Sequence, residues 1–176
     1  AEPYVAACYT NGITSGISAT QYGGDQTVTT AQAALMLMKA LGYFQYQSDF
    51  GSDWQFATIK QATKIDLFDD VDSGVREAMT RNDVAQLVLN TLEAGTVKAS
   101  DDSFIINAGD VSVEGGKVEY VYITSGDSYA RAIQSNLTTN NTSGTTVGSN
   151  IVQLGEKLYQ GDLKMTGETT TVLDGF

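Results

Sequence analysis

An internal repeat of about fifty residues constrains the first half of this chain more than any other feature. Val28–Met38 (VTTAQAALMLM) lies 51 positions before Met79–Leu89 (MTRNDVAQLVL), and Tyr4–Ile13 lies 52 positions before Phe56–Ile65. Each copy predicts a helix, a loop and a second helix. A helix pair with one apolar stripe per helix cannot bury that stripe alone, so we expect the copies to stack on each other or on a neighbouring chain.

Helical periodicity predicts four helices in this half: Pro3–Asn11, Thr30–Leu41, Asp53–Lys64 and Arg81–Glu93. Thr29 to Gln32 reads T-x-x-Q, a capping box in which the threonine oxygen accepts a free backbone N–H and the glutamine reaches back. Thr80 to Asp83 offers a shorter T-x-x-D version. Both repeated helices are therefore predicted to begin at a threonine.

The composition changes near Gly95, after which Val, Ile, Thr and Tyr alternate with polar residues as in strands. Strands are predicted at Phe104–Asn107, Val111–Val113, Val118–Thr124, Ile151–Leu154 and Thr169–Leu173. Gly115-Gly116 predicts a hairpin turn between the second and third of these. Tyr129–Leu137 predicts a short helix, and the polar stretch 138–146 a loop.

These patterns predict an α+β protein with two parts. Residues 1–95 form the helical repeats, with 1–43 as the first unit and 44–95 as the second, and residues 96–176 form a β-rich extension.

Composition excludes several function classes. With 21 acidic and 10 basic residues the net charge is −11, which argues against nucleic-acid binding. Histidine is absent, so Ser-His and Cys-His nucleophile pairs and His-containing zinc sites are excluded. The lone Cys8, in an apolar run, is expected to pack as a small hydrophobe. We expect no catalysis, no cofactor and no membrane span, and a secretory signal absent from this chain.

The segments around the repeated threonines resemble the S-layer homology family. Tyr22–Gln32 is similar to that family's aromatic residue and proline-aspartate pair, followed by a hydrophobic-Thr-Arg-Ala-acidic helix start. Gly12–Gly16 matches its Gly-Ile-x-x-Gly turn, and Phe50–Trp54 its lead into the next unit. Thr30 stands where the family has arginine, and Gly24 where it has proline. The extension 96–176 looks like the segment that follows such modules in some bacterial surface proteins.

The resemblance implies a helical bundle whose grooves hold an anionic secondary cell-wall polysaccharide, gripped by the arginine of the Thr-Arg-Ala-Glu motif. The candidate polysaccharide ligands in this chain are Arg81, Thr80, Trp54, Gly12, Ile13 and Gly16. Arg81 could instead form a local ion pair with Asp83 or Glu77. Trp54 could stack on a sugar ring or close the core.

An acidic loop suggests one further site. Four carboxylates crowd it, at Asp66, Asp69, Asp70 and Asp72, and calcium prefers such oxygen ligands. Their spacing does not fit the D-x-D-x-D-G loop, so a solvated acidic loop is the alternative interpretation.

Three functions follow from these observations. The leading hypothesis is a non-catalytic, extracellular bacterial surface protein that self-assembles through its repeats and β-rich extension. The alternative is an anchoring module that binds secondary cell-wall polysaccharide through Arg81 and the Gly12–Gly16 turn. A second alternative is the accessory module of a larger secreted enzyme.

Overall fold

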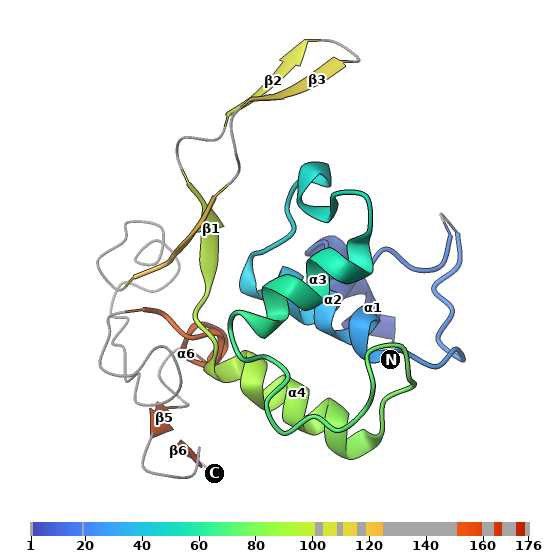
Figure 1. The fold of residues 1–176 in the computed structure, drawn as a ribbon, viewed down its shortest axis with the longest axis vertical. Coiled ribbons are helices and arrows are strands. Elements are labelled where there is room, and N and C mark those ends of the chain that lie inside the picture. The colour runs from blue at the N-terminus through green and yellow to red at the C-terminus, as the bar shows by residue number, and fades with distance from the viewer. Residues whose placement is uncertain are drawn as a thin grey trace. The chain divides into compact units, whose positions relative to one another are not determined.

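A computed structural model describes residues 2–18, 20–100, 104–108, 111–115, 119–124, 151–159, 164–166 and 172–174. The helices are α1 (Glu2–Thr10), α2 (Thr30–Leu41), α3 (Trp54–Thr63), α4 (Arg81–Glu93) and α6 (Leu154–Tyr159), with a 3₁₀ turn η1 (Gln47–Phe50). The strands are β1 (Val97–Ala99), β2 (Phe104–Ala108), β3 (Val111–Gly115), β4 (Tyr120–Tyr122), β5 (Lys164–Thr166) and β6 (Val172–Asp174). The protein is therefore mixed helix and strand, which confirms the α+β class (Figure 1).

The four helices predicted before residue 95 are all present. α2 and α4 begin and end at the predicted residues, while α1 and α3 differ from the prediction by one residue at each end. The contacts within the chain form two compact units, Ala1–Ala40 with Phe50–Thr91 and Leu41–Asp49 with Leu92–Phe176. The domain boundary near residue 95 stays a prediction.

The apolar core of the first unit is built from residues of α2, together with single apolar residues of α3, of the segment after it and of α4. Ala31, Ala34 and Met38 of α2 are fully buried. So are Ala62 of α3, Leu67 and Leu87. Small side chains such as these alanines leave room for neighbouring segments to pack close to α2.

Two buried threonines in this core donate their hydroxyl groups to backbone carbonyls of their own helices. Thr58 donates to the carbonyl of Trp54 at 2.7 Å, and Thr91 donates to that of Leu87 at 2.7 Å. Each bond returns to the carbonyl four residues earlier, so neither buried hydroxyl is left without an acceptor.

Helix α1 differs from the other helices of the first unit because none of its residues is buried. Tyr4 is 77% exposed and Tyr9 is 64% exposed. Cys8, expected to pack as a small hydrophobe, is a half-buried free thiol. An apolar surface of this kind on a short helix is a candidate contact surface.

The second unit is organised around Thr96, which is fully buried. Its N–H donates to the carbonyl of Val152 at 2.8 Å, and its carbonyl accepts from Ile123 at 2.9 Å. β1 then pairs antiparallel with β4, with Lys98 opposite Val121. Val97, Ile123 and Val152 are buried where these three segments meet.

Tyr120 of β4 contacts three residues of the segment that follows α2. Its ring lies 5.3 Å from that of Tyr43, and its hydroxyl accepts the N–H of Gln45 at 2.9 Å. The same hydroxyl donates to the carboxylate of Asp49. Burial, with Asp49 beside it, raises the pKa of Tyr120 well above its ordinary value, so the phenol remains a hydrogen-bond donor across the physiological range.

Strand pairing corrects the prediction of a hairpin turn at Gly115-Gly116. β3 pairs antiparallel with β2, with Ala108 opposite Val111, whereas β4 pairs with β1. Val97–Ala99 was not predicted as a strand because three residues are too short to show alternation.

The predicted strand Ile151–Leu154 is correct only in part. Ile151 and Gln153 form isolated bridges with Thr124 and Gly95, but Leu154 begins α6. Glu156 explains the helix start, because its carboxylate accepts the N–H of Gln153 at 3.0 Å, three residues earlier.

The remaining predictions concern residues 129–146 and 169–173, and the structure describes only some of these residues. β6 (Val172–Asp174) overlaps the predicted strand Thr169–Leu173 at its end and pairs with β5. The predicted helix Tyr129–Leu137 and the predicted loop 138–146 lie outside the described residues. None of the described helices is long and apolar enough to cross a membrane.

Candidate functional site

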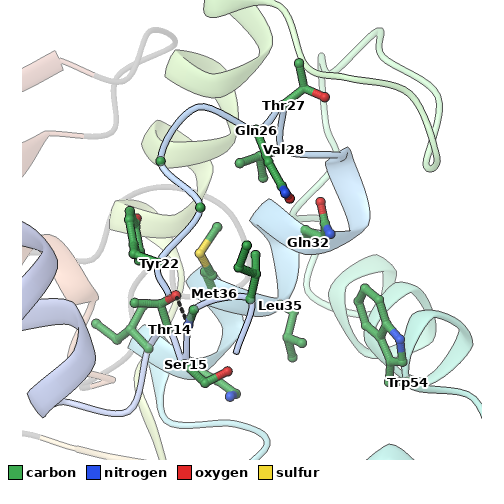
Figure 2. A pocket seen from close by; sticks show the side chains of 16 residues that line it. Thr14, Ser15, Tyr22, Gln26, Thr27, Val28, Gln32, Leu35, Met36 and Trp54 are labelled. Atoms are coloured by element: carbon green, nitrogen blue, oxygen red, sulfur yellow. Dashed lines mark hydrogen bonds between the residues drawn. The ribbon is translucent and has the colours of Figure 1, made fainter. Parts of the chain in front are cut away.

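A groove of about 270 Å³ lies in the first unit, between the loop after α1 and one face of α2 (Figure 2). Its apolar lining comes from Ile13, Ile17, Val28, Leu35 and Met36. Its polar lining comes from Thr14, Ser15, Gln26, Thr27, Gln32 and Lys39. Two aromatic residues, Tyr22 and Trp54, complete it. The lining thus combines apolar surface, aromatic rings and hydrogen-bonding groups, as ligand sites also do.

The outer wall of the groove is a tight turn that depends on glycine. Gly16 has φ +74°, and a Cβ placed there would lie 2.5 Å from the carbonyl oxygen of Gln21. That close approach lets Ile17 donate to the same carbonyl at 2.9 Å, so the chain folds back on itself. Any larger residue at position 16 would open this wall.

The inner wall is α2, whose first turn is held by the predicted capping box. Thr29 donates its N–H to Oε1 of Gln32 at 3.0 Å, and its hydroxyl accepts the N–H of Gln32 at 3.3 Å. The prediction for this helix start is confirmed. Since the cap uses only the oxygen of the Gln32 amide, its NH₂ group retains two donors at the edge of the groove.

Lys39 is the one charged side chain among the groove's lining residues. Its Nζ lies 5.8 Å from the centre of the Phe50 ring, a cation–π contact that holds the ammonium group in place. Within the described part of the chain, no carboxylate is paired with this ammonium. The groove therefore carries local positive charge in a protein whose net charge is −11.

The two aromatic residues stand apart along the groove. In Figure 2, Tyr22 and Trp54 lie on opposite sides of the view, with Leu35 and Met36 between them. Tyr22 is 48% exposed and Trp54 is half-buried at the start of α3. Trp54 thus packs partly against the protein and also lines the groove, while its role in stacking on a sugar stays a prediction.

Three of the six predicted polysaccharide ligands line this groove, namely Ile13, Gly16 and Trp54. Gly12 precedes it with φ +69°, and a Cβ placed there would meet no atom within 4 Å. Thr80 and Arg81 do not line it. Arg81 is exposed at the first position of α4, and its role as a polymer ligand stays a prediction.

Thr80 and Asp83 form a network of their own at the start of α4. Thr80 accepts the N–H of Asp83 at 3.1 Å and donates its hydroxyl to that carboxylate at 2.7 Å. The carboxylate also accepts from the Ser73 hydroxyl and from the N–H of Asp72 at 3.1 Å. Its partners are therefore Ser73, Thr80 and Asp72, rather than the Arg81 guanidinium.

This network changes the acidity of Asp83. The Ser73 hydroxyl, then the Thr80 hydroxyl and the N–H of Asp72, lower its pKa to about 2, because each donor stabilises the ionised carboxylate. The network joins the acidic loop to α4, which gives these residues a structural role.

The structure does not assemble the suggested calcium site. Across the residues it describes, no three acidic or cysteine side chains converge as metal ligands would. Two of the four candidates, Asp66 and Asp70, have positive φ values of 55° and 56°, which aspartate tolerates in tight turns. All four side chains are exposed to solvent.

Sequence reasoning missed Lys39, Gln26 and Gln32 as groove residues. Lys39 and Gln32 lie seven positions apart, which places them on one face of α2 two turns apart. That spacing was available from the sequence. The position of Gln26 was not, because it depends on how the loop returns toward α2.

Comparison with known proteins gives no relative for this chain. No family model, no curated protein and no solved structure matches it.

Proposed function

We propose that this protein is a non-catalytic, envelope-associated module of the bacterial cell surface that binds an acidic cell-wall saccharide in the groove beside α2. The single observation that carries the proposal is the lining of the groove. It combines two aromatic rings with amide and hydroxyl groups and one lysine that has no carboxylate partner in the described residues.

Each part of this lining fits a part of an acidic sugar. The C–H faces of a sugar ring pack on aromatic side chains such as Tyr22 and Trp54. Sugar hydroxyl groups exchange hydrogen bonds with Gln26 and Gln32, and a sugar carboxylate pairs with the ammonium of Lys39. Such a pair is strongest where one partner is already held in position, as the Phe50 ring holds Lys39.

The resemblance to S-layer homology modules supports an acidic sugar as the ligand. The side chain that supplies the positive charge differs between that family and our proposal for this chain. In that family an arginine at the helix start grips the acidic sugar. Here the first copy has Thr30, which is buried and donates its N–H to the carbonyl of Glu77 at 3.1 Å. In our proposal Lys39, further along the same helix, supplies the positive charge.

Sedimentation with cell-wall sacculi tests this proposal. Sacculi of the bacterium that makes the protein are prepared with and without their wall polysaccharide. We expect the protein to sediment only with sacculi that carry the polymer. Lys39→Met should lower the affinity about tenfold, the usual loss for one charge-assisted contact. Lys60→Met, which removes the same charge from an exposed position on α3, is the matched control.

Two outcomes would contradict the proposal. One is equal sedimentation with stripped and intact sacculi. The other is undiminished binding by Lys39→Met together with loss of binding by Arg81→Ala, which would transfer the anion contact from the groove to the start of α4.

A second candidate function, self-assembly, is favoured by one specific observation. α4 buries Asp83, Leu87 and Thr91 but exposes Val84 and Val88, at 45% and 38%. These two valines are four residues apart and share one face, where an isolated helix would carry polar groups. Light scattering tests this candidate. Particles should be larger than one chain and should shrink in the double variant Val84→Ser, Val88→Ser, whereas a monomer at every concentration would exclude it.

A further inference from the structure

A second hollow, of about 460 Å³, lies in the same unit between α1 and the turn that forms the outer wall of the groove. One side consists of the α1 residues Val5, Ala6 and Tyr9, and the other of Ser18, Thr20 and Gln21. Like the groove, it combines an aromatic ring and apolar surface with hydroxyl and amide groups. Its lining is therefore also suited to a sugar.

The hollow and the groove share part of their lining. Ser15, Gly16 and Tyr22 line both of them. The two are thus adjacent sites on either side of one short stretch of chain. A molecule that spans this stretch would contact Tyr22 on both of its sides.

Aromatic residues accompany this path along its length. Trp54 lines the groove, Tyr22 lines both sites, and Tyr9 lines the hollow. Tyr9 is 64% exposed and Tyr22 is 48% exposed, so both rings are accessible to a ligand. Successive aromatic rings along a polar path suit successive sugar units, because each ring offers a flat apolar face to one of them.

The charges along the path differ between its two parts. Lys39 is the charged residue that lines the groove, and Glu2 is the one that lines the hollow. An acidic unit would be attracted to Lys39 and repelled by Glu2. A neutral unit carries hydroxyl groups that can donate to the Glu2 carboxylate.

We propose that the groove and the hollow form one continuous site for an internal stretch of a linear polysaccharide, with an acidic unit beside Lys39 and a neutral unit beside Tyr9. This inference rests on the proposed function and extends it, because it defines the ligand as a chain of several units rather than a single terminal sugar.

Titration with polymer of different lengths tests the inference. The wall polymer is released from the sacculi and separated into single-repeat fragments and chains of several repeats, and each is titrated into the full protein by calorimetry. We expect the long chains to bind at least tenfold more tightly. Tyr9→Ala should lower long-chain affinity about tenfold and leave the affinity for single-repeat fragments unchanged.

Two further variants test whether the polymer occupies the hollow beside Tyr9. Ala6→Trp fills the hollow from the exposed surface of α1 and should act as Tyr9→Ala does. Tyr4→Ala is the matched control, because Tyr4 is 77% exposed on the same helix and lines neither site. Long chains also bind more tightly simply because they carry more copies of the repeat. That gain in affinity would remain in Tyr9→Ala, so an unchanged long-chain affinity of this variant would overturn the inference.

The remaining outcomes distinguish this inference from the proposed function. If the protein binds neither sacculi nor released polymer, the proposed function itself is wrong. If it binds single-repeat fragments as tightly as long chains, the proposed function stands and the continuous site is wrong.

Discussion

Met79 donates its backbone N–H to the carbonyl of Val28 at 3.2 Å, and these two residues are aligned with each other in the internal repeat predicted from the sequence. Thr29 and Ala78 form the adjoining antiparallel bridge. An antiparallel contact between equivalent residues relates them locally by a pseudo-twofold axis. The two copies thus meet, at this point, just before the threonine that caps each repeated helix.

The two copies use the position after this threonine differently, which leads to a first prediction. Thr30 is 1% exposed, and the equivalent Arg81 is exposed. Thr30→Arg makes the first segment like the second at this position, but it forces a guanidinium into a buried site. We expect the free energy of unfolding to fall by about 2 to 4 kcal/mol. Urea unfolding measures this change.

Arg81→Thr is the reverse substitution at the equivalent position, and it should change stability by less than about 0.5 kcal/mol. Equal effects of the two substitutions would show that the copies are not packed differently at this residue.

Asp83 predicts how the stability of the first unit depends on acid. Its pKa is lowered to about 2 in the folded protein, so the folded state binds its proton less readily than the unfolded chain does. The resulting stabilisation is complete above the unfolded value near 4 and is lost as the pH falls toward 2. Asp83→Asn should remove this dependence and lower the melting temperature at pH 7.

Thermal melts of both proteins from pH 7 to pH 2 measure the effect. Ser73→Ala removes the hydroxyl that contributes most to the lowered pKa, and it should give an intermediate pH dependence. Parallel melting curves for Asp83→Asn and the unchanged protein would refute this role for Asp83.

Local signals explain why the helices of the first unit could be predicted. Capping depends on residues three positions apart, and Thr29 with Gln32 form the predicted reciprocal pair. The strands of the second unit depend instead on distant partners. Val97 lies opposite Tyr122, and no pattern within either short segment specifies that pairing. Gly115-Gly116 was a plausible turn by composition, but β3 pairs with the strand before it.

The candidate site could be predicted only where a motif marked it. The resemblance to a family pattern predicts ligand roles for the Gly12–Gly16 turn and Trp54, and Gly16 and Trp54 line the groove. The same pattern predicts Arg81 as a ligand because it has an arginine at that position. Lys39 has no motif, and its value as a groove cation follows from its position over Phe50, which only the three-dimensional structure gives.

Gly42 provides a prediction for the second unit. It follows α2 with φ +106°, and a Cβ there would lie 2.1 Å from the carbonyl oxygen of Val97. Gly42→Ala combines an unfavourable backbone conformation with this clash, so we expect a loss of about 2 to 4 kcal/mol in unfolding free energy. Gly51→Ala is the control, because Gly51 has φ +54° but open space around it, and it should cost about 1 kcal/mol. Equal losses in urea unfolding would mean that contact with Val97 is unimportant.

Glu93, at the end of α4, predicts a pH dependence of the opposite sign. Its Oε1 is buried and has no hydrogen-bond partner among the described residues, and burial raises its pKa to about 6. The folded state therefore binds this proton more readily than the unfolded chain does. Stability should fall as the pH rises from about 4.5 through 6 and then level off.

Glu93→Gln keeps the shape of the side chain and removes the charge. It should raise the free energy of unfolding by about 1 kcal/mol at pH 7.5, after allowance for partial screening by solvent, and change it little at pH 4.5. Urea unfolding at the two pH values measures the difference. Glu2→Gln, on the exposed surface of α1, controls for the loss of one negative charge. If both variants gain equally at pH 7.5, reduced net charge explains the gain. If only Glu93→Gln gains free energy of unfolding at pH 7.5, the buried carboxylate causes the gain.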